Sequence, residues 1–348
     1  MSRLSQTSRV VKAAVVHKFG DSPVYEDWSV SSSPPSPDHV TVKVRAAGLS
    51  QLCRARASGA HYSAKGMSLP LVPGVDGVGS TNDGQLVYFT SFDRAASSGS
   101  FAEVLHVLRK NVVPLPAGSA DPAQVAALVN ATMASWVAFS RSRRDIPRVG
   151  SLGSGKPFTV FILGVTGVSG QLGVQVARLL GADRVIGAGR NRAVLDHLVA
   201  ANHDSALSAA VELTNDTDKV ASEIASAAGK ADIVLDFLWG EPASMAMAAI
   251  AKAPGRDDTQ LLEWIQIGNM AGPDIKMPAS LLRSRNFYMC GSGIGPQTDE
   301  ELLRLIEEFL PHLASGRLSL PVTRVPLKDV ESTWQAPSAN GDRIVFTI

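Results

Sequence analysis

Four glycines at intervals of three residues, Gly164, Gly167, Gly170 and Gly173, link an apolar segment to a stretch with apolar residues at helical spacing. Glycine allows a tight turn and a close approach of a ligand to the backbone, and the first turn of the following helix offers free N–H groups and a positive dipole end. This arrangement suits the pyrophosphate of a dinucleotide. A tight turn without a ligand is the alternative, and the position between a strand and a helix favours the dinucleotide. The residues of this loop expected to contact the cofactor are Gly164, Gly167, Val168, Ser169 and Gly170.

The end of the next predicted strand bears on which dinucleotide is bound. Sites for NAD usually carry an acidic residue there, about 20 residues after the glycines, that accepts hydrogen bonds from the ribose. Here that position is Gly189, followed by Arg190, Asn191 and Arg192. The missing carboxylate cannot repel a 2′-phosphate, and Arg190 can form a charge-assisted contact with one. The alternative is that both arginines only solvate the start of a helix. We predict NADPH as the cofactor, with Gly189, Arg190 and Asn191 in its site.

A second glycine-rich segment, residues 150–157, matches the spacing of a phosphate-binding loop but is not expected to be one. Pro157 stands where serine or threonine would bind Mg²⁺, and the segment precedes a predicted strand instead of following one. We interpret it as a surface turn.

The composition excludes several classes of protein. Hydrophobic residues make up 45% and charged residues 19% of the 348 residues, and the net charge is +1. These values are those of a globular protein, and they give no charge excess that would attract nucleic acid or a membrane surface. No run of 18 apolar residues predicts a membrane span, and the only cysteines are Cys53 and Cys290, too few for a disulfide scaffold. We expect a cytoplasmic protein with a small-molecule substrate and no nucleic-acid or membrane partner.

The chain has two regions with different sequence patterns, and its length fits two domains. The first 125 residues contain short strands with Pro, Ser and Gly clusters between them, which predicts a small β-barrel-like domain. The rest alternates strands with helical stretches, which predicts a parallel sheet with helices on both faces. The predicted early strands are 11–17, 40–47, 86–89 and 102–107, and a helix begins after Asp121. The predicted later strands are 158–163, 184–187, 231–237, 264–267 and 287–290, followed by a helix over 299–313 and strands at 318–325 and 344–348.

Several segments, in order, resemble the medium-chain dehydrogenase/reductase superfamily and its zinc-independent quinone oxidoreductase-like branch. They are KAAVVHKFG (12–20), VTVKVRAAGLS (40–50), LPLVPGVDGVG (69–79), GSFAEV (99–104), ILGVTGVSGQLGVQVARLLGADRVIGAGR (162–190), DIVLDFLWG (232–240) and IQIGNMAG (265–272). The resemblance implies an α/β fold: a GroES-like β-barrel catalytic domain from residues 1–128 and 295–348, and a Rossmann doubly wound parallel-sheet domain from residues 129–294 that binds NADPH. It also implies that Leu238, Ile267 and Gly268 approach the nicotinamide half, with Asn130 and Gly293 nearby.

Zinc-using members of this superfamily hold their metal with a cysteine, a His-Glu pair and a later cysteine. The corresponding positions here are Ser50 and Val75-Asp76, and Cys53 lies off the ligand position. A tetrahedral zinc site needs three protein ligands besides water. We therefore expect no metal, and we expect Asp76 to cap a turn or pair with a base.

The candidate catalytic loop departs from the branch. The Asn-Pro-x-Asp of related enzymes is replaced by residues 50–53 (SQLC), and a tyrosine found in some relatives aligns with Ala55. The nearest replacements are His61 and Tyr62. We name Tyr62 and Ser50 as the candidate catalytic residues. The alternative for Tyr62 is a partly buried packing residue with its hydroxyl bonded to the backbone.

The favoured activity is NADPH-dependent reduction of a conjugated carbonyl, an enone or a quinone. Reducing a simple ketone makes a localised alkoxide that needs a metal or a strong acid, whereas hydride addition to an enone leaves a delocalised charge. One alternative is a carbonyl or alcohol oxidoreductase with Tyr62 or His61 as its acid, and another is a non-catalytic NADPH-binding protein. The expected apolar lining of the substrate pocket is Leu52, Tyr62, Phe89, Trp136 and Trp239.

The last predicted strand of the parallel sheet, residues 286–290 (NFYMC), is an apolar edge that invites pairing. Relatives in this branch often form dimers across this edge, so a homodimer is expected. The alternative is that the charges of Arg283 and Arg285 keep this edge solvated and unpaired.

Overall fold

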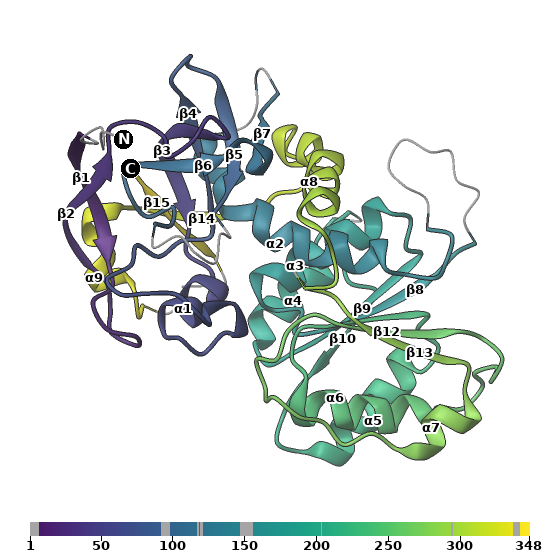
Figure 1. Cartoon of the computed structure of the whole chain (residues 1–348). Helices are drawn as coiled ribbons and strands as arrows, with labels where there is room; N and C mark the ends of the chain where they lie inside the picture. Colours follow the sequence, from purple (N-terminus) through teal and green to yellow (C-terminus); the bar gives the residue numbers. More distant parts are fainter. Residues whose placement is uncertain are drawn as a thin grey trace. The chain divides into compact units, whose positions relative to one another are not determined.

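The computed structural model describes residues 7–91, 98–116, 118, 121–146, 156–202, 204–293, 295–336 and 342–348. The chain folds into two compact units (Figure 1). The first unit is Met1–Asn130 with Phe309–Ile348, and the second is Ala131–Glu308. The second boundary therefore falls after residue 308 instead of at 294, because the first part of helix α8 (Asp299–Ala314) belongs to the second unit. There the indole nitrogen of Trp136 donates to Glu308 at 3.2 Å.

The second unit contains a six-stranded sheet in which every pairing is parallel, in the order β10-β9-β8-β11-β12-β13. The strand order reverses between β8 and β11, which lie side by side at its centre. This is the doubly wound arrangement, and it confirms the predicted Rossmann fold. The strands are β8 (Thr159–Leu163), β9 (Arg184–Gly189), β10 (Ala209–Glu212), β11 (Ile233–Asp236), β12 (Leu262–Gln266) and β13 (Phe287–Gly291).

Helices cover both faces of this sheet, so its central strands are almost wholly buried (Figure 1). Strands buried on both faces are continuous apolar runs, which makes them recognisable in the sequence. The predicted helix after the glycines is α3 (Val168–Leu179). The other helices of this unit are α4 (Arg192–Ala200), α5 (Thr217–Ala228), α6 (Gly240–Ala251) and α7 (Ala279–Ser284).

The first unit is built on a mixed seven-stranded sheet in the order β14-β15-β3-β4-β5-β7, with β6 paired to β3. Val345 of β15 pairs with Gly48 of β3, so the two ends of the chain share one sheet, as the resemblance implied. A separate antiparallel pair joins β1 to β2. The strands are β1 (Ser8–Val15), β2 (Val24–Ser31), β3 (His39–Gly48), β4 (Asp76–Thr81), β5 (Leu86–Thr90), β6 (Val104–Leu108), β7 (Val112–Pro114), β14 (Val322–Pro326) and β15 (Arg343–Thr347). Short helices are α1 (Gln51–Ala57), α9 (Val330–Thr333) and the 3-10 turns η1 (Tyr62–Ala64), η2 (Arg109–Asn111) and η3 (Leu327–Asp329).

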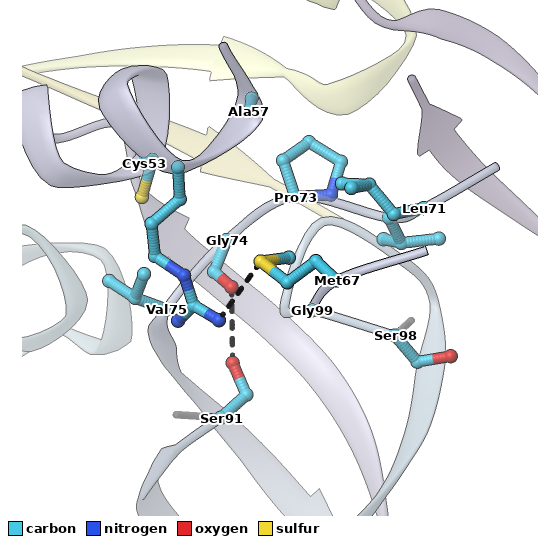
Figure 2. A pocket seen from close by; sticks show the side chains of 12 residues that line it. Cys53, Ala57, Met67, Leu71, Pro73, Gly74, Val75, Ser91, Ser98 and Gly99 are labelled. Carbon is cyan, nitrogen blue, oxygen red and sulfur yellow. Dashed lines mark hydrogen bonds between the residues drawn. The ribbon is translucent and has the colours of Figure 1, made fainter. Parts of the chain in front are cut away.

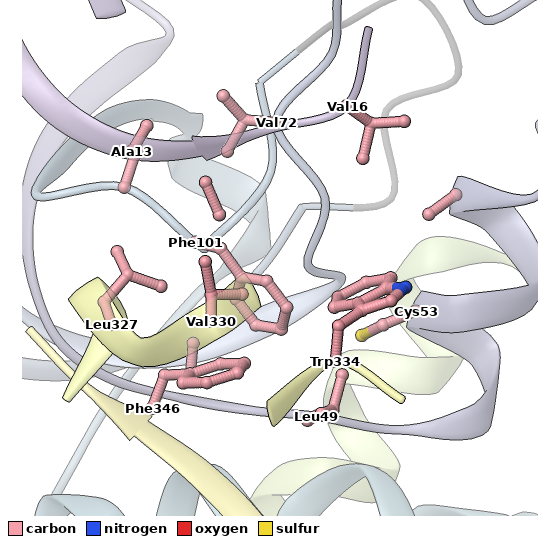
Figure 3. Close-up of a cluster of buried hydrophobic side chains, with 14 of the residues drawn as sticks. Ala13, Val16, Leu49, Cys53, Val72, Phe101, Leu327, Val330, Trp334 and Phe346 are labelled. Atoms are coloured by element: carbon pink, nitrogen blue, oxygen red, sulfur yellow. The ribbon is translucent and has the colours of Figure 1, made fainter. Parts of the chain in front are cut away.

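An aromatic cluster forms the core of the first unit (Figure 3). The ring of Phe101 meets Phe346 edge-on at 5.1 Å and Trp334 at 6.3 Å. Edge-to-face pairs of this kind stabilise beyond the area they bury. Because Trp334 and Phe346 come from the C-terminal segment, this core ties that segment to the N-terminal strands.

Helix α2 (Pro122–Ser140) contains residues of both units and is long and apolar enough to span a bilayer. In this structure 78% of its most apolar 18-residue stretch is buried, as in the core helix of a folded domain. Asp121 begins the helix as predicted, because its carboxylate accepts a hydrogen bond from the amide of Ala123 at 3.1 Å.

Candidate functional site

The glycine loop between β8 and α3 is held in one conformation by the protein itself. Gly164 has a φ of +91°, which favours glycine, and its amide donates to the carbonyl of Ala188 in β9 at 2.9 Å. A Cβ on Gly170 would lie 2.4 Å from the carbonyl oxygen of Gly164 and 2.6 Å from the Cα of Val165. Only glycine at 170 therefore lets the helix pack against the turn.

Gly167 differs from these glycines because neither its backbone conformation nor any neighbouring atom among the described residues requires a glycine there. Its φ of −81° and ψ of 161° suit any residue, and a Cβ at this position would have its nearest neighbouring atom 3.6 Å away. Gly167 is exposed at the N-cap of α3, and the next two residues, Val168 and Ser169, are partly exposed in its first turn. The first N–H groups of a helix have no partner within it. The amide of Gly167 itself donates to the carbonyl of Gly164 at 3.2 Å, so the groups open to a ligand are the exposed backbone of Gly167 and the N–H groups of the first turn of α3.

The end of β9 shows a second reason for the glycine at position 189. A Cβ there would lie 2.5 Å from Cγ2 and 2.8 Å from Oγ1 of Thr166, so the acid of an NAD site has no room unless Thr166 moves. Arg190 is exposed, and no carboxylate in the described part of the chain forms an ion pair with it. The guanidinium is thus available to an anionic ligand.

The residues after Arg190 are engaged in helix α4. Arg192 forms a bidentate pair with Asp196, at 2.6 and 3.1 Å, which fits the helix-surface alternative for this arginine. The side-chain oxygen of Asn191 caps α4 by accepting from the amide of Val194 at 3.2 Å. Of the two arginines, only Arg190 is left as the candidate phosphate ligand.

Asp236, at the end of β11, holds the loop that follows this strand at the carboxyl edge of the parallel sheet. The sequence did not predict it as a site residue. One of its carboxylate oxygens accepts from the amides of Leu238 (2.9 Å) and Trp239 (2.8 Å), and the other accepts from the indole of Trp264 at 3.0 Å. Burial raises the pKa of this carboxyl, against these hydrogen bonds, which lower it. The available signal was an acid at the end of an otherwise apolar strand.

The backbone of Asp236 also fixes the loop after β12. Its carbonyl accepts from the amides of Ile267 at 2.8 Å and Gly268 at 3.1 Å. A Cβ on Gly268 would lie 2.6 Å from the carbonyl of Phe237, so the two loops are in close contact. The structure thus brings Leu238, Ile267 and Gly268 together at the carboxyl edge of the sheet, where doubly wound folds bind ligands.

The two other predicted cofactor residues are Gly293 and Asn130, and only Gly293 lies next to a residue that contacts these loops. Gly293 follows β13, and the amide of its neighbour Ser292 donates to the carbonyl of Gln266 at 2.7 Å, which ties this loop to the end of β12. Asn130 lies in α2 and is the last residue of the first unit's opening segment.

Ser50 is committed to a structural hydrogen-bond pair at the start of α1. Its buried hydroxyl accepts from the amide of Cys53 at 3.1 Å and donates to the Cys53 thiol, also at 3.1 Å. Burial raises the pKa of that thiol. The hydroxyl therefore caps a helix, and this role differs from the predicted catalytic one.

Tyr62 is 62% exposed, which is not the partly buried packing role considered as its alternative. Its ring stacks on His61, with centroids 4.1 Å apart. Nδ1 of His61 accepts from the amide of Ser63 at 3.2 Å, and burial lowers the pKa of the imidazole. His61 is therefore a turn cap that stays neutral near pH 7, and Tyr62 is the more available acid.

Two residues proposed for the substrate pocket are core residues instead. Phe89 has no exposed surface and packs among the strands of the first unit, and Trp136 is 4% exposed. Aromatic residues in strands and helices more often fill a core than line a site, and the sequence pattern cannot separate the two. Leu52 and Tyr62 retain exposed surface in the first unit, as does Trp239 in the second.

Asp76, at the position of a zinc-binding segment in related enzymes, is fully buried and accepts a hydrogen bond from the hydroxyl of Tyr88 at 2.8 Å. Burial raises the pKa of its carboxyl to about 7, although Tyr88 and the buried Arg343 both act to lower it. Within the described residues, no group of three His, Cys, Asp or Glu side chains is arranged to hold a metal ion.

The raised pKa of Asp76 predicts a pH-dependent stability. Its ordinary value is 3.8, so between about pH 4 and pH 7 the folded protein binds more protons than the unfolded chain. The free energy of unfolding therefore falls as the pH rises through this window, by about 1.4 kcal/mol per pKa unit at most. Asp76→Asn should flatten this slope in urea titrations between pH 4.5 and 8, and an unchanged slope would contradict the assignment.

A small cavity lies beside Cys53 in the first unit (Figure 2). Its walls include Met67, Gly74 and Val75, and a hydrogen bond from Ser91 to the carbonyl of Gly74 (3.2 Å) crosses it. Its volume is about 10 Å³, which is the room one water needs. This cavity is too small for an organic substrate.

Comparison with known proteins identifies a relative of the chain. No family model matches it. The probable NADPH-dependent quinone reductase tdiC of Emericella nidulans is 30% identical over 359 aligned positions, which cover 93% of this chain and 96% of the relative.

Solved structures share the fold. The quinone oxidoreductase of Thermus thermophilus, solved also in complex with NADPH, superimposes with a TM-score of 0.72 at 22% identity, covering 97% of this chain and 100% of that one. A quinone oxidoreductase from Pseudomonas syringae pv. tomato gives 0.73 at 19% identity, again covering 97% and 100%. With a relative at 30% identity along nearly its whole length and this shared fold, the chain belongs to the quinone reductases of the medium-chain dehydrogenase/reductase superfamily.

Proposed function

We propose that the protein is an NADPH-dependent oxidoreductase that transfers hydride to a conjugated carbonyl, a quinone or an enone. The observation that carries this proposal is the state of two residues, Gly167 and Arg190, at the carboxyl edge of the parallel sheet. Gly167 is free of any structural requirement there, and Arg190 is exposed without an ion-pair partner among the described residues. The relative from Emericella nidulans supports the proposal by its name, as a probable NADPH-dependent quinone reductase.

The residues present fit this cofactor. We assign the pyrophosphate to the backbone from Gly167 to Gly170, the 2′-phosphate to Arg190, and the nicotinamide half to Ile267 and Gly268. The cofactor, when bound, supplies the hydride. The protein's part is to orient it, to keep water away from it and to place the acceptor.

The class of hydride acceptor follows from which side chains can act as a proton donor in the reaction. The described residues provide no metal-ligand cluster, Ser50 is used as a helix cap, and His61 is held neutral. A conjugated acceptor spreads the charge that hydride addition creates, so it places the smallest demand on such an acid. Tyr62, with its exposed hydroxyl, is the residue we propose to assist protonation.

A carbonyl or alcohol oxidoreductase is the second candidate, and the exposure of Tyr62 is the observation that favours it. The two candidates differ in how much they need this hydroxyl. A simple ketone requires a positioned acid, whereas the product of a conjugated acceptor can take its proton from water.

Tyr62→Phe should therefore lower kcat/KM with a quinone or an enone by no more than about 100-fold, the low end of the effect of a general acid. NADPH affinity should stay unchanged in this variant. A loss of several decades with intact NADPH binding would make Tyr62 the essential acid and favour the second candidate, and no loss at all would remove Tyr62 from the reaction.

An acceptor panel tests the proposed function. NADPH oxidation is followed with quinones, enones, aldehydes and ketones in parallel. Turnover of the conjugated acceptors alone supports the proposal, and efficient turnover of only aldehydes or ketones would replace it by the second candidate. Tight NADPH binding with no turnover would identify a non-catalytic NADPH-binding protein.

We further propose a cytoplasmic homodimer that pairs through the edge strand β13. Arg285 does not guard this edge, because it turns to Asp258, at 2.5 Å, and to the carbonyl of Ala251. The side chains of Phe287, Tyr288 and Met289 remain partly exposed along the strand. Light scattering at micromolar concentration should give twice the mass of the 36.6 kDa chain, and a monomer mass would refute the dimer.

A further inference from the structure

Trp239 has a backbone conformation that bulky residues avoid. Its φ is +57° and its ψ is −155°, and it is the one non-glycine residue with positive φ among those the structure describes. Such a conformation is strained and persists only where surrounding contacts hold it. Glycine would adopt it without this strain. The presence of tryptophan therefore calls for a contact that glycine cannot make.

The indole makes that contact. Nε1 of Trp239 donates to the carbonyl of Pro273 at 3.1 Å, and the ring packs against the hydrophobic core of the second unit. The amide of the same residue donates to the buried carboxylate of Asp236 at 2.8 Å. Trp239 is thus anchored at its backbone to β11 and at its side chain to Pro273, near the middle of the loop between β12 and α7.

Two more contacts join the loop after β11 to the loop after β12. The amide of Ala271 donates to the carbonyl of Leu238 at 2.8 Å. A Cβ on Gly240 would lie 2.5 Å from the carbonyl oxygen of Ala271, so the backbones touch. The loop after β12 is therefore held at its start by Asp236 and near its middle by Leu238 and the indole.

We propose that Trp239 is a positioning residue that sets this loop for the nicotinamide half of NADPH. The inference rests on the proposed function, because that half is assigned to Ile267 and Gly268 at the start of the loop. The strained backbone is the consequence of directing the indole to Pro273. Trp239 thereby acts through the loop, without a role in holding the adenosine half at Arg190.

The test compares two ligands on the same variants. NADPH reports on both halves of the site, whereas 2′,5′-ADP reports on the adenosine half alone. Trp239→Phe keeps an aromatic ring but cannot donate to Pro273, and Trp239→Gly also relieves the strained backbone. Arg190→Ala is the matched control, since it should weaken both ligands.

In Trp239→Phe the Kd for NADPH should rise about five- to tenfold, as for one lost hydrogen bond, and in Trp239→Gly it should rise further. The Kd for 2′,5′-ADP should stay within about twofold in both variants, which also shows that they are folded. With a quinone at saturating NADPH, kcat should fall in both variants. Equal weakening of both ligands, or unchanged NADPH affinity and kcat, would overturn the inference. Failure of the unsubstituted protein to bind NADPH would instead overturn the proposed function.

Discussion

Gly167→Val is expected to weaken NADPH binding at least 100-fold while the protein keeps its stability. Nothing in the described structure lies closer than 3.6 Å to a Cβ at this position, and the backbone there suits valine. The new side chain would occupy the space in which a pyrophosphate approaches the N-terminus of α3, so the protein tolerates it and the ligand does not. Calorimetric titration with NADPH, together with thermal unfolding, measures the two effects separately.

Gly170→Ala is the matched comparison, and it should fail in a different way. Its Cβ would lie 2.4 Å from the carbonyl oxygen of Gly164, so the turn itself must move and stability should fall together with binding. If Gly167→Val binds NADPH as tightly as the unsubstituted protein, the pyrophosphate does not lie on this loop.

Arg190→Ala should weaken NADPH by about one to two decades and leave NADH nearly unchanged. A charge-assisted hydrogen bond is worth roughly 1.5–3 kcal/mol, and NADH lacks the 2′-phosphate that would receive it. Arg192→Ala is the control from the same segment, because Arg192 is paired with Asp196 and should not contribute. The assignment would be contradicted by equal affinities of the unsubstituted protein for the two cofactors, or by a larger effect at Arg192 than at Arg190.

The sequence predicted most of the parallel sheet, because its strands are apolar on both faces. The strands β8, β9, β11, β12 and β13 begin and end within about two residues of their predicted limits, and the glycine loop lies where it was expected. The four-residue edge strand β10 was missed, since its residues Ala209–Glu212 include no long apolar run. In the first unit β2, β4 and β7 were also missed, because their polar or short segments carry little periodicity.

The contacts that shape the site were harder to predict, because they join residues far apart in the chain. The clash between Gly189 and Thr166 and the bond from Trp239 to Pro273 depend on strand register and loop conformation, neither of which is encoded in a local pattern. Hydrogen bonding of Ser50 to Cys53 is local, with the spacing of a helix N-cap, and was recognisable in principle. Ser50 also occupies a position of the family's catalytic loop, and this position favoured a catalytic role over the cap.

The most direct test of the proposed chemistry follows the hydride itself. The protein is supplied with NADPH deuterated at the transferred position of C4 and with an α,β-unsaturated ketone, and the product is examined by NMR. One deuterium at the β-carbon of a saturated ketone is the predicted result. Deuterium on the carbonyl carbon of an unsaturated alcohol would contradict the account and establish a carbonyl reductase.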